Sequence, residues 1–341
     1  MSSSVAPSRT VRVLWAKRSA SLARRTDAPD GGIILWKPRG PSSRALIDQV
    51  QHRLQWRGLG HCGTLDPLAS GVMVLIGGAA RRFQQLLTGH DKRYLATVWL
   101  GVASGSDDAE GPLYCPVPAP RWPTTDQIVH QLEKMTGQIE QVPPAHSAVR
   151  IAGRRSYQRA RAGDTTAPPS RTVTVHSMQL IEHDQQRLRL DIACGSGTYI
   201  RSIARDLGRQ LGCQASLMAL RRSASGSYDA SMAVLPDRVV ASDWLSLEQL
   251  LAAQPRIEVS REHALRLAQG QRLPVDEVTG CNILADALAA EGRGEEPLVV
   301  WSEDRIRGLV RISDGVLRPR RWLASRDNDT SDQTRIDATS A

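Results

Sequence analysis

The spacing of apolar residues along the chain changes several times between the repeat of a strand and the repeat of a helix. Continuous apolar runs predict buried strands at Gly31–Lys37 and Gly71–Gly77. Alternation of apolar and polar residues predicts half-buried strands at Thr172–Ile181 and Arg187–Ala193, and a further strand is expected at Arg93–Gly101. At least five strands of one sheet are therefore expected in the first two thirds of the chain.

Apolar residues three and four positions apart predict three helices among these strands. The first begins at Ser42 or Ser43, either of which can cap it, and ends near Trp56; the others cover Thr124–Met135 and Thr198–Leu211. Strands and helices are interspersed without a regular βαβ alternation, which favours an α+β fold with a mixed sheet over a doubly wound one.

The pattern changes again towards the end of the chain. After a short helix near Ser246–Arg256, three strand-like pieces follow at Leu298–Trp301, Gly308–Ile312 and Val316–Leu323. We therefore expect a main domain over residues 31–250 and a small β-rich module over 256–325, with an irregular insertion at 280–296. Residues 1–30 and 326–341 are expected to be disordered tails, the first basic and the second polar.

Composition restricts the class of protein. The chain has 341 residues, 41% of them apolar, and no uninterrupted apolar run of the ~18 residues that a membrane-spanning helix needs. Its five cysteines are scattered and none forms a CxxC pair, which favours a reducing compartment over a disulfide framework or a Cys-rich zinc site. Integral membrane proteins and small disulfide-rich proteins are therefore excluded.

The net charge of +9 is unevenly distributed. Six basic and no acidic residues precede residue 27, and residues 150–222 hold thirteen basic residues against five acidic ones. A basic stretch inside the folded part is typical of a face that binds a polyanion such as a nucleic acid. The alternative is genome composition, since 40 of the 44 basic residues are arginine.

Candidate chemistry is concentrated in the segment Gly60–Gly71, GHCGTLDPLASG. Asp66 stands between Leu65 and Pro67 in a loop that enters the strand at 71–77, and His61 precedes it by five residues. Loops at strand ends commonly present catalytic groups. An Asp-Pro pair is more often a turn whose carboxylate caps a backbone amide, and spacing alone does not decide between these interpretations.

The segment resembles the catalytic loop of the bacterial tRNA pseudouridine-55 synthases of the TruB type. Further blocks, before and after this segment, also resemble motifs of that family and stand in the same order. They are Lys37-Pro38 with Gly40 and Ser42-Ser43, Gly78 with Phe83, Asp91-Lys92-Arg93-Tyr94, Asp108 with Gly111, Ser147-Ala148 with Gly153, Arg155, Tyr157, Ala160 and Arg161, Gly197-Thr198-Tyr199-Ile200-Arg201 with Asp206-Leu207-Gly208, and Leu220-Arg221-Arg222. These blocks are distributed over a stretch of about 190 residues.

The resemblance implies a pseudouridine synthase catalytic domain with a largely antiparallel sheet, followed by an RNA-binding barrel of the PUA type. It implies an isomerase that flips the uridine at position 55 out of the T-loop of tRNA and converts it to pseudouridine. Neither a cofactor nor a metal is expected, and tRNA is the expected partner of a monomer that needs no protein partner and no membrane. The expected location is the cytoplasm, with organellar import through the N-terminal arm as the alternative.

The family's functional residues map onto individual positions. Asp66 matches the catalytic nucleophile, and Arg201 matches the arginine that pairs with it. The positions expected to contact or line the substrate site are His61, Tyr94, Tyr199, Leu220 and Lys37, of which Lys37 matches a structural or pocket-adjacent lysine. From the residues alone, Tyr94 and Leu220 also fit an ordinary core. Arg201, Arg205 and Arg209 also fit a solvated helical stripe; we expect that interpretation to hold for Arg205 and Arg209 only.

The chain departs from the family's pattern at a few positions: Ala79-Ala80-Arg81-Arg82, His146, Ser104 with Ser106, and Cys62, which is expected to be a buried filler. Two alternative functions remain at this stage. One is a non-catalytic RNA-binding protein, which retention of Asp66, Tyr94 and Arg201 argues against. The other is a glycosidic-bond hydrolase, which would need a second catalytic carboxylate. Whether Asp66 attacks uracil C6 or acts at the ribose stays open.

Overall fold

The computed structural model describes residues 25–115, 122–147, 168–278 and 296–323, with isolated positions at 149–151, 154–156, 159, 164 and 166. The expected irregular insertion and polar tail lie almost entirely outside these residues, as does most of the basic tail. The last residues of that tail are ordered, because β1 (Thr26–Asp27) pairs with β3 (Trp56–Arg57). None of the described helices is long and apolar enough to cross a membrane.

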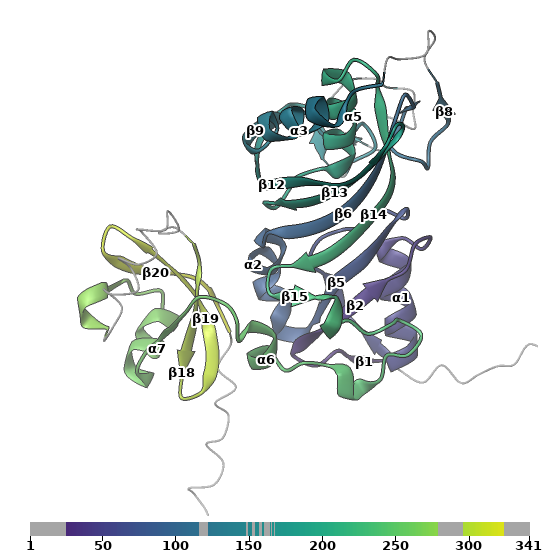
Figure 1. Ribbon diagram of the computed structural model, residues 1–341. Helices are drawn as coiled ribbons and strands as arrows, with labels where there is room; N and C mark the ends of the chain where they lie inside the picture. The colour runs from purple at the N-terminus through teal and green to yellow at the C-terminus, as the bar shows by residue number, and fades with distance from the viewer. Residues whose placement is uncertain are drawn as a thin grey trace, which may run out of the picture.

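A nine-stranded sheet forms the body of the protein, and its strands run side by side through the centre of Figure 1. The main path is β2 (Gly31–Lys37), β5 (Ala69–Gly77), β14 (Ala215–Ser225), β6 (Lys92–Leu100), β13 (Arg187–Cys194), β12 (Arg171–Asp184) and β9 (Gly137–Gln141). All neighbours on this path are antiparallel except β5 and β14, which are parallel. The expected mixed, largely antiparallel sheet is confirmed.

Shorter strands complete the sheets of the first two thirds of the chain. β4 (Gly60–His61) pairs with β5, and β15 (Tyr228–Asp229) pairs with β14. Two separate hairpins are formed by β7 (Ala103–Ser104) with β8 (Leu113–Tyr114), and by β10 (Arg150–Ile151) with β11 (Arg154–Arg155). The β4 pairing places the beginning of the expected catalytic loop alongside β5, an inner strand of the main sheet.

The three expected helices are present. α1 (Ser43–Leu54) is capped by the Ser42 hydroxyl, which accepts a hydrogen bond from the Ala45 amide. α3 (Thr125–Lys134) begins with a capping box formed by Thr124 and Gln127. α5 (Ile200–Gln210) buries a face of Ile200, Ile203, Ala204 and Leu207 against the sheet. Shorter helical segments are η1 (Gly78–Phe83), α2 (Gln84–Gly89), η2 (Ala230–Met232), η3 (Ala241–Asp243) and α6 (Leu247–Leu251).

A curled five-stranded sheet forms the C-terminal module, on the left of Figure 1. Its order is β16 (Arg256–Glu258), β18 (Leu298–Ser302), β19 (Arg305–Ser313), β20 (Val316–Trp322) and β17 (Leu273–Pro274), with α7 (Arg261–Ala268) packed against it and η4 (Val275–Glu277) after β17.

The module and the main domain share a hydrophobic core. Val299, Ile306 and Leu309 of the module are buried in one cluster with Phe83 and Leu87 of the main domain. The Arg82 guanidinium also donates a hydrogen bond to the Trp322 carbonyl oxygen, at 2.5 Å. Apolar contact of this kind fixes the orientation of two domains, whereas a polar interface of similar size leaves them free to move.

Candidate active site

Asp66 lies in the loop between β4 and β5, and this loop is fixed at several points. The Ser43 hydroxyl accepts a hydrogen bond from the Leu65 amide (2.9 Å) and donates one to the Leu65 carbonyl oxygen (2.8 Å). The Asp66 carbonyl oxygen accepts from the Ala69 amide at 3.0 Å, which closes a turn. Asp66 is thus also a turn residue, and its side chain remains 35% exposed.

Lys37 lies beneath this loop and is fully buried. Its ammonium group donates to the carbonyl oxygens of Ala69 (2.7 Å), Pro38 (3.0 Å) and Pro67 (3.4 Å). Burial lowers the pKa of Lys37 to about 8, although the Glu110 and Asp66 carboxylates favour its charged form. Lys37 is therefore a buried anchor for the backbone that follows Asp66 and not an exposed group.

Arg201 pairs with Asp66, as expected. Its Nε lies 3.0 Å from Asp66 Oδ2, and its Nη1 lies 3.5 Å from Asp108 Oδ2. The same guanidinium donates to the carbonyl oxygens of Ser106 (3.2 Å) and His146 (3.0 Å). A buried arginine therefore joins the Asp66 loop, the turn that carries Ser106 and Asp108, and the segment that leads into residues 147–170.

The protonation of Asp66 follows from the same contacts. Burial raises the pKa of the Asp66 carboxyl, Arg201 is the largest opposing influence, and the neighbouring Asp108 carboxylate raises the pKa further. Removal of Arg201 would leave both raising influences without their main opponent. Arg201 thus favours the ionised form of the carboxylate and orients it.

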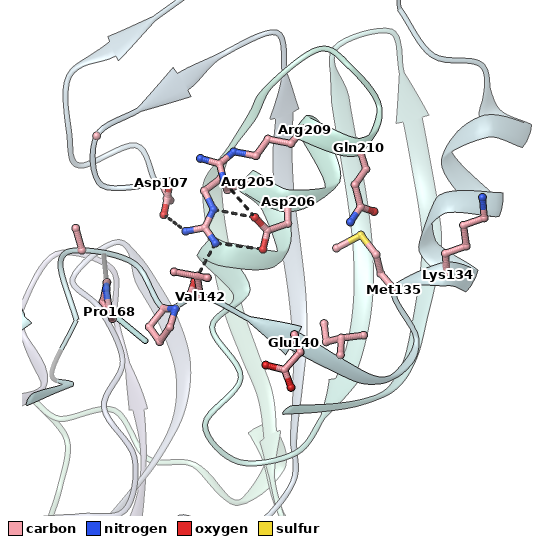
Figure 2. A pocket seen from close by; sticks show the side chains of 14 residues that line it. Asp107, Lys134, Met135, Glu140, Val142, Pro168, Arg205, Asp206, Arg209 and Gln210 are labelled. Atoms are coloured by element: carbon pink, nitrogen blue, oxygen red, sulfur yellow. Dashed lines mark hydrogen bonds and ion pairs between the residues drawn. The ribbon is translucent and has the colours of Figure 1, made fainter. Parts of the chain in front are cut away.

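The expectation for Arg205 was wrong. Its side chain points towards Asp107 and Asp206 (Figure 2), with ion pairs of 2.9 Å to each, and it also donates to the Val142 carbonyl oxygen at 2.8 Å. Only 11% of the side chain is exposed, whereas Arg209 is 61% exposed, as expected. Spacing on a helix predicts which residues share a face; it does not show that the loop carrying Asp107 covers part of that face.

A cavity of about 900 Å³ lies beside these residues; Figure 2 shows the side chains that line it. Side chains from α3, β9 and α5 line it, together with Pro143, Ala145 and Pro168. Asp66, Tyr94 and Tyr199 are not among the residues that line it, so this cavity is separate from the site around Asp66.

Tyr94 and Leu220 form an apolar wall next to the Asp66 loop. Both belong to the buried cluster that contains Leu65 and Leu68, and they are 8% and 7% exposed. Burial raises the pKa of the Tyr94 hydroxyl, so it is protonated at neutral pH. Both residues are thus core residues as well as neighbours of the catalytic loop.

Tyr199 stands at the beginning of α5, one position before its first helical residue. The Gln141 side chain fixes its backbone, accepting from the Tyr199 amide (2.8 Å) and donating to its carbonyl oxygen (3.1 Å). The Arg171 guanidinium lies 4.8 Å from the centre of the ring, a cation–π contact. This contact places one cation of the basic stretch beside the N-terminus of α5, the helix that carries Arg201.

His61 is half-buried in β4, where burial lowers the pKa of its imidazole. Its Nδ1 is buried and has no hydrogen-bond partner among the described residues. Cys62, next to it, is fully buried, and burial raises the pKa of its thiol to about 12. The expectation of a filler at Cys62 is confirmed, since a thiol with that pKa is not nucleophilic at neutral pH.

Two groups of this site were not selected from the sequence. In the sequence Asp108 stands only in a motif block with Gly111, yet it is 2% exposed and contacts Arg201. Arg222 is the last residue of another motif block, yet it is 1% exposed and donates to the Gly63 and Val72 carbonyl oxygens. A charged residue inside an apolar strand, as in ALRRS, is the signal that could have identified Arg222.

The fold of the chain is shared with chains in solved structures of H/ACA ribonucleoproteins. One solved structure, of an H/ACA ribonucleoprotein bound to a substrate RNA containing 2'-deoxyuridine, aligns with a TM-score of 0.61 over 87% of this chain and 86% of that chain, at 19% identity. The archaeal Nop10–Cbf5 complex aligns with a TM-score of 0.61 over 91% of this chain and 90% of that chain, at 20% identity. At this identity the likeness defines the fold class alone.

Sequence comparison then gives the family. The family model for the N-terminal domain of TruB family pseudouridylate synthases matches residues 51–200, and that for the C-terminal domain of tRNA pseudouridylate synthase B matches residues 201–267. Two relatives are named tRNA pseudouridine synthase B. The protein of Aromatoleum aromaticum is 35% identical over 91% of this chain and 97% of its own length. The protein of Synechococcus is 37% identical over 86% of this chain and 97% of its own length. The chain belongs to the TruB family of pseudouridylate synthases, which are isomerases.

Proposed function

We propose that this protein converts the uridine at position 55 in the T-loop of tRNA to pseudouridine, with Asp66 as the nucleophile. The observation that carries the proposal is the Asp66 carboxylate, partly exposed on a fixed loop, ion-paired with Arg201 and flanked by Tyr94 and Leu220. The tRNA substrate is inferred from the names of the relatives, which are similar over nearly their whole length.

The reaction breaks the C1′–N1 glycosidic bond, rotates the uracil and forms a C1′–C5 bond. The C5 proton is lost to solvent and N1 gains a proton, so substrate and product are isomers and no electrons are gained or lost. Asp66 acts as nucleophile at uracil C6 or at ribose C1′, and its bond to the substrate breaks again when the new C–C bond has formed. Arg201 favours the ionised carboxylate and directs it towards the substrate.

The target uridine must leave the stack of the T-loop before Asp66 reaches its glycosidic bond. The Tyr94 ring and the Leu220 side chain offer an apolar surface for a base flipped out in this way. The Tyr199 ring with Arg171 lies at the edge of the site, where a cation near an aromatic ring suits the RNA backbone. His61 is the remaining residue expected to contact the RNA, beside the position from which the base leaves.

The Asp108 carboxylate, which lies near Asp66, is poorly suited to be the second carboxyl group of a two-carboxylate hydrolysis. Asp108 is buried, and its Oδ1 accepts from the Ser106 hydroxyl (2.6 Å) and the Glu110 amide (3.0 Å). Its other oxygen faces Arg201. A glycosidase needs its second carboxyl group free to exchange a proton with substrate or water, and these bonds occupy Asp108.

The basic stretch at 150–222 contributes less surface charge than its composition suggests. Arg201, Arg205 and Arg222 are largely buried, and Arg187 and Arg189 both pair with Glu182. We therefore place the RNA-binding face at the site itself, around Tyr199 and Arg171, with the C-terminal module as a PUA-like extension. The enzyme acts as a cytoplasmic monomer without an obligatory protein partner.

The test is tritium release from uridine labelled at C5 in an unmodified tRNA transcript. We expect release by the wild type, none by Asp66→Asn, and equal tRNA affinity of both proteins by filter binding. A transcript with cytidine in place of U55 should give no release from the T-loop. Binding without release by the wild type would refute the isomerase, and equal release from the cytidine transcript would refute the specificity for position 55.

A further inference from the structure

Arg222 is a buried charge at the centre of the main sheet. It belongs to β14, between β5 and β6 in Figure 1, where it is the register partner of Gly71 on one side and Tyr94 on the other. Its side chain is among the largest that are fully buried. The structure shows no ion pair between Arg222 and any described carboxylate.

A buried cation without a carboxylate is costly to a folded protein, because neither water nor a counter-ion compensates the charge. An arginine cannot avoid this by losing its proton. A second cation nearby increases the cost: burial lowers the pKa of Lys92 to about 8, and Arg222 is the next largest cause of that lowering. An arginine retained here is therefore expected to have a role other than stability.

The two hydrogen bonds of Arg222 indicate that role. Its Nη2 donates to the Gly63 carbonyl oxygen at 3.2 Å, and its Nε donates to the Val72 carbonyl oxygen at 2.7 Å. These carbonyls lie on either side of Asp66, one at the beginning of the loop and one in β5. Gly63 has a φ of +108°, and a Cβ built on it would lie 3.4 Å from Arg222 Nη1, so the loop approaches the guanidinium closely.

Arg222 also acts on Tyr94, the residue opposite it in the sheet. Its charge opposes the rise that burial causes in the pKa of the Tyr94 hydroxyl, which shows that the two groups are electrostatically close. One side chain thus joins the backbone of the catalytic loop to the aromatic wall of the site. Lys37 and Arg201 contact other parts of the loop: Lys37 holds the Pro67 and Ala69 carbonyls, and Arg201 holds the carboxylate.

We propose that Arg222 is a positioning residue for the isomerisation, which holds the first half of the Asp66 loop at a fixed distance from Tyr94. The inference rests on the proposed function, since it assigns Arg222 to the step in which Asp66 attacks the flipped uridine. Arg222 touches neither the RNA nor the reacting atoms. Its loss displaces the carboxylate from the base and leaves the RNA-binding surface in place.

The chain offers a matched control. Arg221 is the preceding residue on β14 and is exposed, with its guanidinium 5.7 Å from the centre of the Trp36 ring. Arg221→Gln and Arg222→Gln make the same chemical change one residue apart in the same strand. Arg222→Lys is the conservative variant, because it keeps the charge and can donate to one of the two carbonyls.

Three measurements are compared: single-turnover tritium release, tRNA affinity, and hydrogen exchange of the Leu65 amide, which is bonded to the Ser43 hydroxyl. For Arg222→Gln we expect a rate about 100-fold below wild type, the size expected for a displacement of about 1 Å. We also expect tRNA affinity within about threefold and Leu65 exchange at least about tenfold faster, as the loop opens more often. Arg222→Lys should recover part of the rate, and Arg221→Gln should match the wild type in all three.

Each other result has a definite meaning. A wild-type rate per folded molecule in Arg222→Gln, a loss confined to tRNA affinity, or unchanged Leu65 exchange would overturn the proposal. An equal loss of rate in Arg221→Gln would show that removing a positive charge from this strand has a general effect on the reaction with RNA, and this result would also overturn the proposal. Failure of the wild type to release tritium would refute the proposed function. In that case accelerated Leu65 exchange in Arg222→Gln would still establish that Arg222 holds the loop, and unchanged exchange would refute this as well.

Discussion

Replacement of Lys37 by methionine tests whether Lys37 contributes more to the geometry of the Asp66 loop than to the stability of the fold. The ammonium group is fully buried and donates to three carbonyl oxygens, two of them at 2.7 and 3.0 Å. Methionine has a similar length but no charge and no donor. The change therefore removes an unfavourable buried charge and favourable hydrogen bonds together.

The magnitudes follow from the structure. Burial lowers the pKa of Lys37 from 10.5 to about 8, which corresponds to roughly 3 kcal/mol by which the charged form is disfavoured. Two hydrogen bonds from a charged donor contribute about 1.5–3 kcal/mol each. We therefore expect Lys37→Met to lower the free energy of unfolding by only about 0–3 kcal/mol. We expect the rate of tritium release to fall about 100-fold, because the Pro67 and Ala69 carbonyls belong to the backbone that directly follows Asp66.

The pH dependence gives an independent check. The folded pKa of Lys37 lies below its unfolded value, so the unfolded state binds more protons between about pH 8 and 10.5. Stability rises with pH wherever the unfolded state binds more protons. The free energy of unfolding of the wild type should therefore increase relative to that of Lys37→Met over this range, as the buried ammonium group loses its charge.

The assays are urea unfolding at pH 7, 8, 9 and 10, and single-turnover tritium release at pH 7.5. Lys134→Met is the control, since Lys134 is exposed at the end of α3; it should leave both stability and rate unchanged. A wild-type rate in Lys37→Met, or a stability difference that shrinks with rising pH, would show that Lys37 does not act as a buried, charged anchor.

Further predictions concern the sheet, the ion pair and the module. Gly71→Ala should lower the free energy of unfolding, measured in urea, by at least about 2 kcal/mol, because φ of Gly71 is +120° and the new Cβ would lie 2.2 Å from a β14 carbonyl oxygen. For Gly89→Ala the free energy of unfolding should stay within about 1 kcal/mol of wild type, because a Cβ there would have no atom within 4 Å. Arg201→Gln should shift the acid limb of the pH–rate profile to higher pH, because Arg201 is the main influence that lowers the pKa of Asp66; an unmoved limb would contradict this. Leu309→Ala should lower the free energy of unfolding by about 2–4 kcal/mol, because it leaves a cavity in the core that the two domains share. Calorimetry of this variant should still show one unfolding transition; two separate transitions would argue against a core common to both domains.

Much of the architecture could be predicted from the sequence because it depends on local periodicity. The apolar runs at 31–37 and 71–77 became β2 and β5, and the helical spacing after Ser42, Thr124 and Thr198 became α1, α3 and α5. The boundaries differ by a residue or two where a tertiary contact sets the end. α5 begins at Ile200, two residues later than predicted, because the Gln141 side chain binds the backbone of Tyr199.

Asp66 and its pairing with Arg201 also followed from the sequence, through resemblance to a family; local pattern alone favoured a simple turn. What a charged side chain does inside the fold depended on the tertiary structure. Arg205 and Arg209 are one helical turn apart with the same chemistry, yet only Arg205 is covered by the loop that carries Asp107. Lys37 and Arg222 reach carbonyl oxygens 32 and 150 residues away. Periodicity reports which residues are near in sequence, whereas the buried cations around Asp66 are positioned by strands that become neighbours only when the sheet forms.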